Sequence, residues 1–175
     1  MRRNTAPLSD DVRITFAYGL PPMNICEQAE ELRLSLIMGL VERSDVIRWA
    51  DSLIAASEHV PEWVLDVSLA ANQSAEMIES KLRDLPCNGN RMTSAYSAIR
   101  RFSEAFQSGR LAIARAIRML ELWAGSARVP QDGWTKAMTP TWIADDAMHG
   151  IFSSDDVIAS VNECIAYFAA VPGPG

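Results

Sequence analysis

The chain has 175 residues, of which 49% are hydrophobic and 22% charged, and these proportions are ordinary for a single globular domain. Its formal net charge of −6 argues against general nucleic-acid binding, which requires clustered positive charge. No apolar run approaches the roughly 18 residues that a membrane span needs, and no apolar stretch follows the basic residues 1–4. We therefore predict neither a membrane span nor a signal peptide.

Charge is unevenly distributed along the chain. Residues 1–80 hold 13 acidic and 6 basic side chains (net −7), and residues 81–128 hold 9 basic and 3 acidic ones (net +6). Residues 129–175 hold 6 acidic side chains and 1 basic one (net −5). Two interpretations stay open: the basic middle neutralises the acidic ends within the fold, or one of these surfaces faces a charged partner.

Residues 1–23 form an N-terminal segment for which the sequence supports two structures. Apolar side chains alternate with others at Val12, Ile14, Phe16 and Tyr18, which is typical of a short strand. Ser9-Asp10-Asp11 and Gly19-Leu20-Pro21, however, resemble the start and the stop of a helix. Both structures remain open.

Four helices are predicted between residues 24 and 85. Asn24 and Glu27 form a capping box that begins a helix reaching about residue 41. Ser44 is expected to cap a second helix, whose apolar stripe has a period of 3.6 residues. A third helix, near residues 61–71, is apolar on most sides and is expected to be buried. A fourth spans about residues 74–85, and a loop follows.

The second half of the chain also has helical periodicity. Residues 92–124 predict two helices or one long bent helix, with the break at Ser108-Gly109. Residues 125–139 resemble a loop, and Pro140 is expected to start a short helix that ends near His149. Asp155 and Asp156 favour the N-terminus of a final helix, because acidic side chains stabilise the positive end of the helix dipole.

These elements predict an all-α fold of seven or eight helices, packed as antiparallel hairpins around a single core. We expect one helical domain over residues 24–171 and a flexible tail over residues 172–175. The segments 39–55 and 150–166 share six identities in 17 aligned positions, which either marks a duplicated hairpin or reflects two similar capped helices.

No recognisable catalytic motif is present, so we expect neither an enzyme nor a cofactor. His59 and His149 lie at predicted helix ends, where histidine usually serves as a capping residue. The three cysteines fit no zinc or redox spacing, and an odd number without a pattern favours a reducing compartment. We therefore expect a cytoplasmic location.

An acidic segment with two tryptophans is the candidate binding surface. Aromatic side chains anchor interfaces and acidic ones steer a basic partner towards them, although the sequence favours the alternative that both tryptophans are core residues. The candidate partner-binding residues are Asp132, Trp134, Trp142, Asp145, Asp146, Asp155 and Asp156.

Three stretches between Leu32 and Ala70 carry a resemblance to a known class of protein. They are Leu34-Ser35-Leu36-Ile37-Met38-Gly39-Leu40, Asp45-Val46-Ile47-Arg48-Trp49-Ala50-Asp51 and Pro61-Glu62-Trp63-Val64-Leu65-Asp66-Val67-Ser68-Leu69-Ala70. This quarter of the chain resembles small helical bacterial immunity proteins, which are encoded beside polymorphic or contact-dependent toxins. The resemblance implies a cytoplasmic protein that binds and occludes a toxin, but it assigns no functional residue.

The predicted function is therefore a non-catalytic protein-binding module, most concretely an immunity-type inhibitor whose partner is a basic toxin domain. The alternative is a helical regulatory or assembly adaptor, which could be a homodimer.

Overall fold

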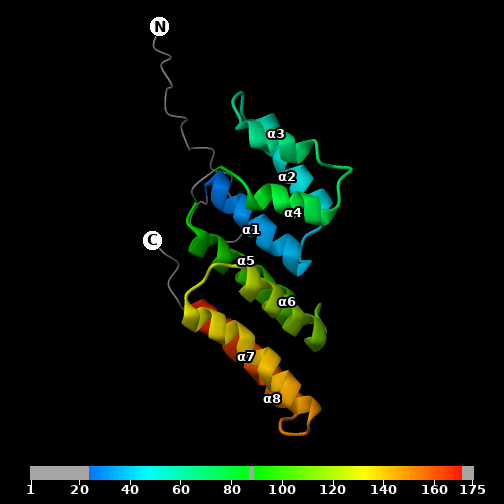
Figure 1. The fold of residues 1–175 in the computed structure, drawn as a ribbon, viewed down its shortest axis with the longest axis vertical. Helices are drawn as coiled ribbons and strands as arrows, with labels where there is room; N and C mark the ends of the chain where they lie inside the picture. The colour runs from blue at the N-terminus through cyan, green and yellow to red at the C-terminus, as the bar shows by residue number, and fades with distance from the viewer. Residues whose placement is uncertain (1–23, 87–88, 171–175) are drawn as a thin grey trace.

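The computed structural model describes residues 24–86 and 89–170. Within these ranges the chain is all-helical, as predicted, and has no strand. The eight helices are α1 (Ile25–Met38), α2 (Arg43–Ala56), α3 (Glu62–Ser68), α4 (Ala75–Arg83), α5 (Arg91–Gln107), α6 (Ile113–Ser126), α7 (Gln131–Met148) and α8 (Ser154–Ala170) (Figure 1). The alternatives for residues 12–18 and the tail 172–175 lie outside the described residues.

Helix α1 lies between two groups of helices. Leu34 and Met38 belong to a cluster of buried side chains from α1, α5, α6, α7 and α8. Leu32 and Leu36, on the same helix, belong to a second cluster with α2, α3 and α4. Because α1 contributes to both clusters, nine of its fourteen residues are buried and it joins the two halves of the core.

The ends of α1 follow from local sequence. Asn24 and Glu27 form the predicted capping box, in which the Asn24 side chain accepts the Glu27 N–H at 2.9 Å and the Glu27 carboxylate accepts the Asn24 N–H at 3.0 Å. The helix stops at Gly39, whose φ of 70° lies in the left-handed region that glycine adopts without steric cost.

Two expectations about α2 and α3 are wrong. The residue that caps α2 is Glu42, which forms a capping box with Asp45, and Ser44 lies inside the helix. Helix α3 is short and is not buried on most sides, because Leu65 and the C-terminal Leu69 are 41% and 81% exposed. Only its Val64 and Val67 are buried, on the side that faces the second cluster.

The long periodic stretch after residue 90 forms two helices, and the predicted break at Ser108-Gly109 is confirmed. The predicted loop over residues 125–139 is wrong, because α7 already begins at Gln131. Pro130 precedes α7, and Pro140, the expected start of a short helix, lies buried within it. Proline inside a helix forgoes one backbone hydrogen bond, and the packing of α7 against α6 and α8 offsets that cost.

The two similar segments, 39–55 and 150–166, have the same local structure. Each begins with a left-handed glycine, Gly39 or Gly150, after a helix ends. In each, an aspartate three positions into the next helix accepts the backbone N–H of the capping residue, Asp45 from Glu42 and Asp156 from Ser153. The two segments therefore share the same way of ending one helix at a glycine and starting the next with an aspartate at its third position.

Candidate functional site

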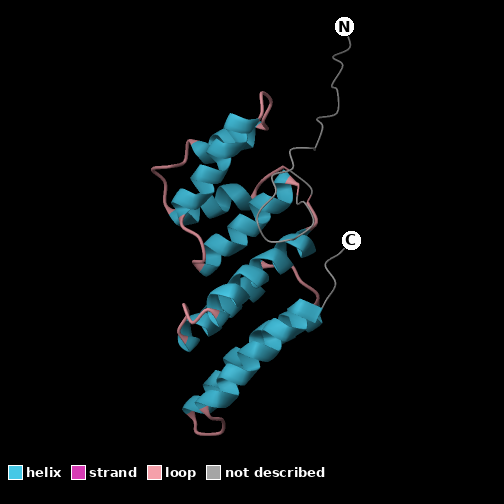
Figure 2. Cartoon of the chain, turned by 180° about the vertical axis from the view of Figure 1, so that it is seen from behind, coloured by secondary structure: helices cyan, strands magenta, loops and turns pink. Residues whose placement is uncertain are grey.

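Helices α7 and α8 pack against each other along their length and form a hairpin. Their connection, residues 149–153, lies at one end of the long axis of the molecule (Figures 1 and 2). The hairpin brings the end of α7 beside the start of α8, so two pairs of candidate residues lie near this connection. They are Asp145 and Asp146 on α7, and Asp155 and Asp156 on α8.

Large apolar side chains are exposed in the same region. Of the eight large hydrophobic residues exposed in the described part of the chain, five fall between residues 142 and 158. Met148 is 79% exposed and Ile151 is 65% exposed, and apolar side chains that gather on one surface, unlike scattered ones, mark interaction sites. We call this surface the hairpin tip, which comprises Trp142, Asp145, Asp146, Met148, Ile151, Phe152, Asp155, Asp156 and Ile158.

The acidic side chains of the hairpin tip have no cationic partner among the residues that the structure describes. None of the acidic residues between 129 and 170 forms an ion pair with a described residue. Asp156 accepts hydrogen bonds from the backbone and side chain of Ser153, at 2.8 and 2.7 Å, which lowers the pKa of its carboxyl. The tip therefore carries negative charge that the fold does not neutralise.

Part of the basic middle region, in contrast, is used inside the molecule. Arg101 on α5 contacts the buried Glu31 on α1 at 2.9 Å, and Ser35 donates to the same carboxylate at 3.0 Å. Burial raises the pKa of Glu31, although the positive charge of Arg101 opposes that effect. Basic residues of the middle region, 81–128, thus pair with acidic residues of region 1–80. The acidic residues of region 129–170 form no ion pair with a described residue.

Two of the candidate residues lie away from the hairpin tip. Asp132 is at the opposite end of α7, where its carboxylate accepts the Tyr167 hydroxyl at 2.6 Å and ties the start of α7 to the end of α8. This hydrogen bond lowers the pKa of Asp132 and raises the pKa of Tyr167 to about 12. Trp134, also near the start of α7, is partly buried against the larger core cluster.

The two tryptophans of α7 therefore differ in role. Trp142 is 45% exposed and contacts the half-buried Trp134, with ring centroids 6.0 Å apart in an edge-to-face arrangement. Trp134 thus supports Trp142 from the core side, and Trp142 presents its remaining surface to solvent.

Four apolar members of the tip are absent from the sequence-based candidates: Met148, Ile151, Phe152 and Ile158. Helical periodicity treats Ile158 as a core residue and gives no reason to expect Met148 at the surface. Ile151 and Phe152 did offer a signal, because two large apolar residues directly follow Gly150 in a connection, where polar residues are usual.

Other chemistry is sparse in the described residues. No group of three or more His, Cys, Asp or Glu side chains there could hold a metal ion, and no described helix is long and apolar enough to cross a membrane. Cys164 is a free thiol buried in α8, and burial raises its pKa to about 12. Cys26 is disulfide-bonded, which is more usual in oxidising than in reducing compartments.

Comparisons of the chain with protein-family models, with curated proteins and with solved structures found no match. The three stretches between Leu32 and Ala70 that were quoted above lie on α1, α2 and α3, and several of their residues are core residues. Trp49 and Trp63, for example, stack at 6.1 Å, and the Trp49 indole donates to the buried Gln28 at 3.0 Å. These stretches therefore contribute to the packing of one half of the molecule, and they are distant in sequence from the hairpin tip.

Proposed function

We propose that this chain is a non-catalytic protein-binding module that docks a basic protein on its hairpin tip, in the manner of an immunity-type inhibitor that occludes a bacterial toxin. The observation that carries the proposal is the coincidence, at the tip, of exposed apolar side chains and unpaired carboxylates. Protein interfaces combine apolar anchors in this way with charges that direct the encounter.

The apolar side chains would supply most of the affinity. Trp142, Ile151 and Phe152 can be desolvated by a partner without disturbing the core, because they already lie outside it. Burying one large apolar side chain contributes about 1.5–3 kcal/mol before the costs of association. A few such anchors suffice for a specific complex.

The carboxylates would select the partner. Four aspartates within twelve residues, with His149 as the sole basic type among them, attract a cationic surface and repel an anionic one. A second copy of the chain is disfavoured at this surface, because tip-to-tip contact would bring eight carboxylates together. This reasoning favours a basic protein over a homodimer, and many nucleic-acid-cleaving toxins would present such a surface.

The proposal predicts that a basic toxin domain is encoded beside this chain. The test is protection of cells from that domain, followed by measurement of the dissociation constant. Replacing Asp145, Asp146, Asp155 and Asp156 by asparagine removes four charges and keeps an acceptor at the Ser153 cap. We expect this variant to lose protection and to bind more weakly, with a smaller dependence on salt.

The matched control replaces four exposed acidic residues elsewhere, Glu58, Glu62, Asp66 and Glu104, by their amides, which changes the net charge equally. This control should protect like the wild type. Equal loss in both variants would show that net charge matters and the tip does not, and full protection by the tip variant would refute the proposed surface.

One further observation favours the adaptor alternative. The other three exposed large apolar residues, Leu65, Leu69 and Met77, lie on α3, at its end and on α4, in the other half of the molecule. An adaptor needs two such surfaces, one for each partner. Simultaneous binding of two proteins, one lost on Leu69→Ser and the other on Ile151→Ser, would support the adaptor over the inhibitor.

A further inference from the structure

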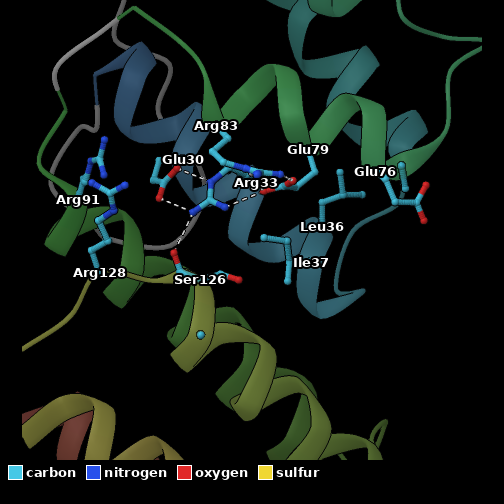
Figure 3. A pocket seen from close by; sticks show the side chains of 12 residues that line it. Glu30, Arg33, Leu36, Ile37, Glu76, Glu79, Arg83, Arg91, Ser126 and Arg128 are labelled. Carbon is cyan, nitrogen blue, oxygen red and sulfur yellow. Dashed lines mark hydrogen bonds and ion pairs between the residues drawn. The ribbon is translucent and has the colours of Figure 1, made fainter. Parts of the chain in front are cut away.

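A cleft of about 740 Å³ lies between α1, α4 and the region where α6 ends, far in sequence from the hairpin tip. Its volume falls within the range of about 300–1,000 Å³ that is typical of small-molecule sites. The lining residues include four arginines and three glutamates, and Figure 3 shows how they are arranged. The distribution of these charges indicates what the cleft can bind.

Two of the arginines are neutralised inside the protein. Arg33, whose side chain is 7% exposed, donates to both oxygens of Glu30, at 2.6 and 2.7 Å, and to Glu79 at 2.8 Å. Arg83 contacts the second oxygen of Glu79. These two arginines and two glutamates balance one another and form a fixed wall of the cleft.

The other two arginines, Arg91 and Arg128, are not neutralised by any residue in the described part of the chain. Neither forms an ion pair or side-chain hydrogen bond with a described residue. Arg91 is the first residue of α5, whose first turn holds no acidic side chain, although Glu27 accepts the preceding N–H of Asn90. The positive end of the α5 dipole therefore adds to the charge of Arg91.

Figure 3 shows both unpaired arginines at one end of the cleft, beside the ion pair of Glu30 with Arg33. Leu36 and Ile37 lie beyond this pair, towards Glu76 at the other end. The carboxylate of Glu76 accepts a hydrogen bond from the nearby Ser74 side chain, which lowers the pKa of Glu76. The cleft thus offers two guanidinium groups, an apolar floor and, on Arg33, one Nη1 N–H that makes no hydrogen bond to a described residue.

We propose that this cleft binds a small molecule that carries a phosphate monoester group, with Arg91 and Arg128 as the residues that hold the phosphate. A phosphate monoester carries a charge of about −1.5 to −2 at neutral pH, which matches two guanidinium groups better than a single carboxylate does. Arginine also presents paired N–H donors with the geometry of phosphate oxygens. The apolar body of the ligand lies against Leu36 and Ile37.

Long-range attraction does not contribute to phosphate binding, because the chain as a whole has a net charge of −6 and repels anions at a distance. Binding therefore depends on direct contacts to the two arginines. This proposal is independent of the proposed function, since the cleft and the hairpin tip share no residue.

The test is isothermal titration calorimetry of the full chain with phenyl phosphate, and with phenylacetate as the carboxylate counterpart. We expect the wild type to bind phenyl phosphate more tightly than phenylacetate. Arg91→Gln combined with Arg128→Gln should weaken phosphate binding at least about tenfold, the effect of losing one charge-assisted hydrogen bond or more. Arg128→Gln alone, between α6 and α7, keeps the test informative if the double variant folds poorly.

The matched control is Arg100→Gln with Arg110→Gln, which removes two exposed arginines outside the cleft. It should bind phenyl phosphate within about twofold of the wild type, as expected for residues without contact to the ligand. Three results would overturn the proposal: no binding by the wild type at millimolar concentration, equal weakening in the control, or tighter binding of phenylacetate than of phenyl phosphate.

Discussion

Replacing Arg33 by methionine is expected to destabilise the fold strongly, because this buried guanidinium joins both halves of the molecule. It makes two hydrogen bonds to Glu30, one to Glu79 and one, at 3.1 Å, to the carbonyl of Ser126 at the end of α6. Methionine fills similar space, so the substitution mainly removes the charge and its donors.

The magnitude follows from what is left behind. The Glu30 side chain is 20% exposed and loses its cation, whereas Glu79 keeps Arg83 as a partner. Breaking a buried ion pair costs about 3–5 kcal/mol, and the retained Arg83 contact places the expected loss at the lower end, about 3 kcal/mol.

Urea denaturation followed by circular dichroism measures this loss directly. Arg48→Met provides the comparison, because the Arg48 side chain is 76% exposed in its ion pair with Asp45. We expect that variant to lose at most about 0.5 kcal/mol, as is usual for surface pairs. If Arg33→Met costs less than about 1 kcal/mol, the network does not join the two halves as described.

Other predictions test separate parts of the structure. The raised pKa of Glu31 stabilises the wild type below the pKa that this carboxyl has in the unfolded chain, and the stabilisation is lost as pH rises through its pKa in the folded protein. Glu31→Gln lacks this dependence, so its free energy of unfolding should increase relative to that of the wild type as pH rises. Unfolding free energies of both proteins across acidic and neutral pH would show the opposite trend if Arg101 governed this pKa. In the native protein, Cys164 should resist iodoacetamide at pH 8, because a thiol with a pKa of about 12 is ionised in roughly one molecule in 10,000 at that pH. Unfolding should expose Cys164 to the reagent. Labelling of Cys164 in the native protein, detected by peptide mass spectrometry, would contradict its burial. Ile151→Ser should change stability by less than about 0.5 kcal/mol in thermal unfolding, because Ile151 is 65% exposed, and a larger loss would place it in the core. Sedimentation velocity at low salt should give a monomer of 19.3 kDa if repulsion between the tip aspartates of two copies prevents self-association. A dimer that becomes more stable when the four tip aspartates are replaced by asparagine would agree with this repulsion, but it would show that the copies associate through a second interface.

Much of the fold could be predicted because helix ends are specified locally. The capping box at Asn24 and the break at Ser108-Gly109 need only neighbouring residues, and both are confirmed. The loop prediction for residues 125–139 was wrong because it also depended on local signals. Gly133 and Pro140 disfavour a helix locally, and only packing against α6 and α8 makes α7 continuous. Gly133 is close to the Phe168 ring there, where an added Cβ would lie 3.4 Å from the ring.

The candidate site was predictable only in part. Acidic residues close in sequence could be grouped by inspection, and the turn after α7 does bring four of them to one end. Asp132 was grouped with them by its proximity in sequence, but the length of α7 separates it from the tip and Tyr167 occupies it. Arg91 begins α5 and Arg128 follows α6, so they line the same cleft only in the folded chain and no local pattern groups them.

Site-specific photo-crosslinking in cells tests the central claim most directly, because it reports which surface touches the partner. A photoreactive residue at position 151, on the hairpin tip, is compared with one at position 58, between α2 and α3. We predict a covalent adduct with a basic protein from position 151 only, and its loss when the four tip aspartates are changed to asparagine. An adduct from position 58 alone, or one from position 151 that survives those substitutions, would contradict the account.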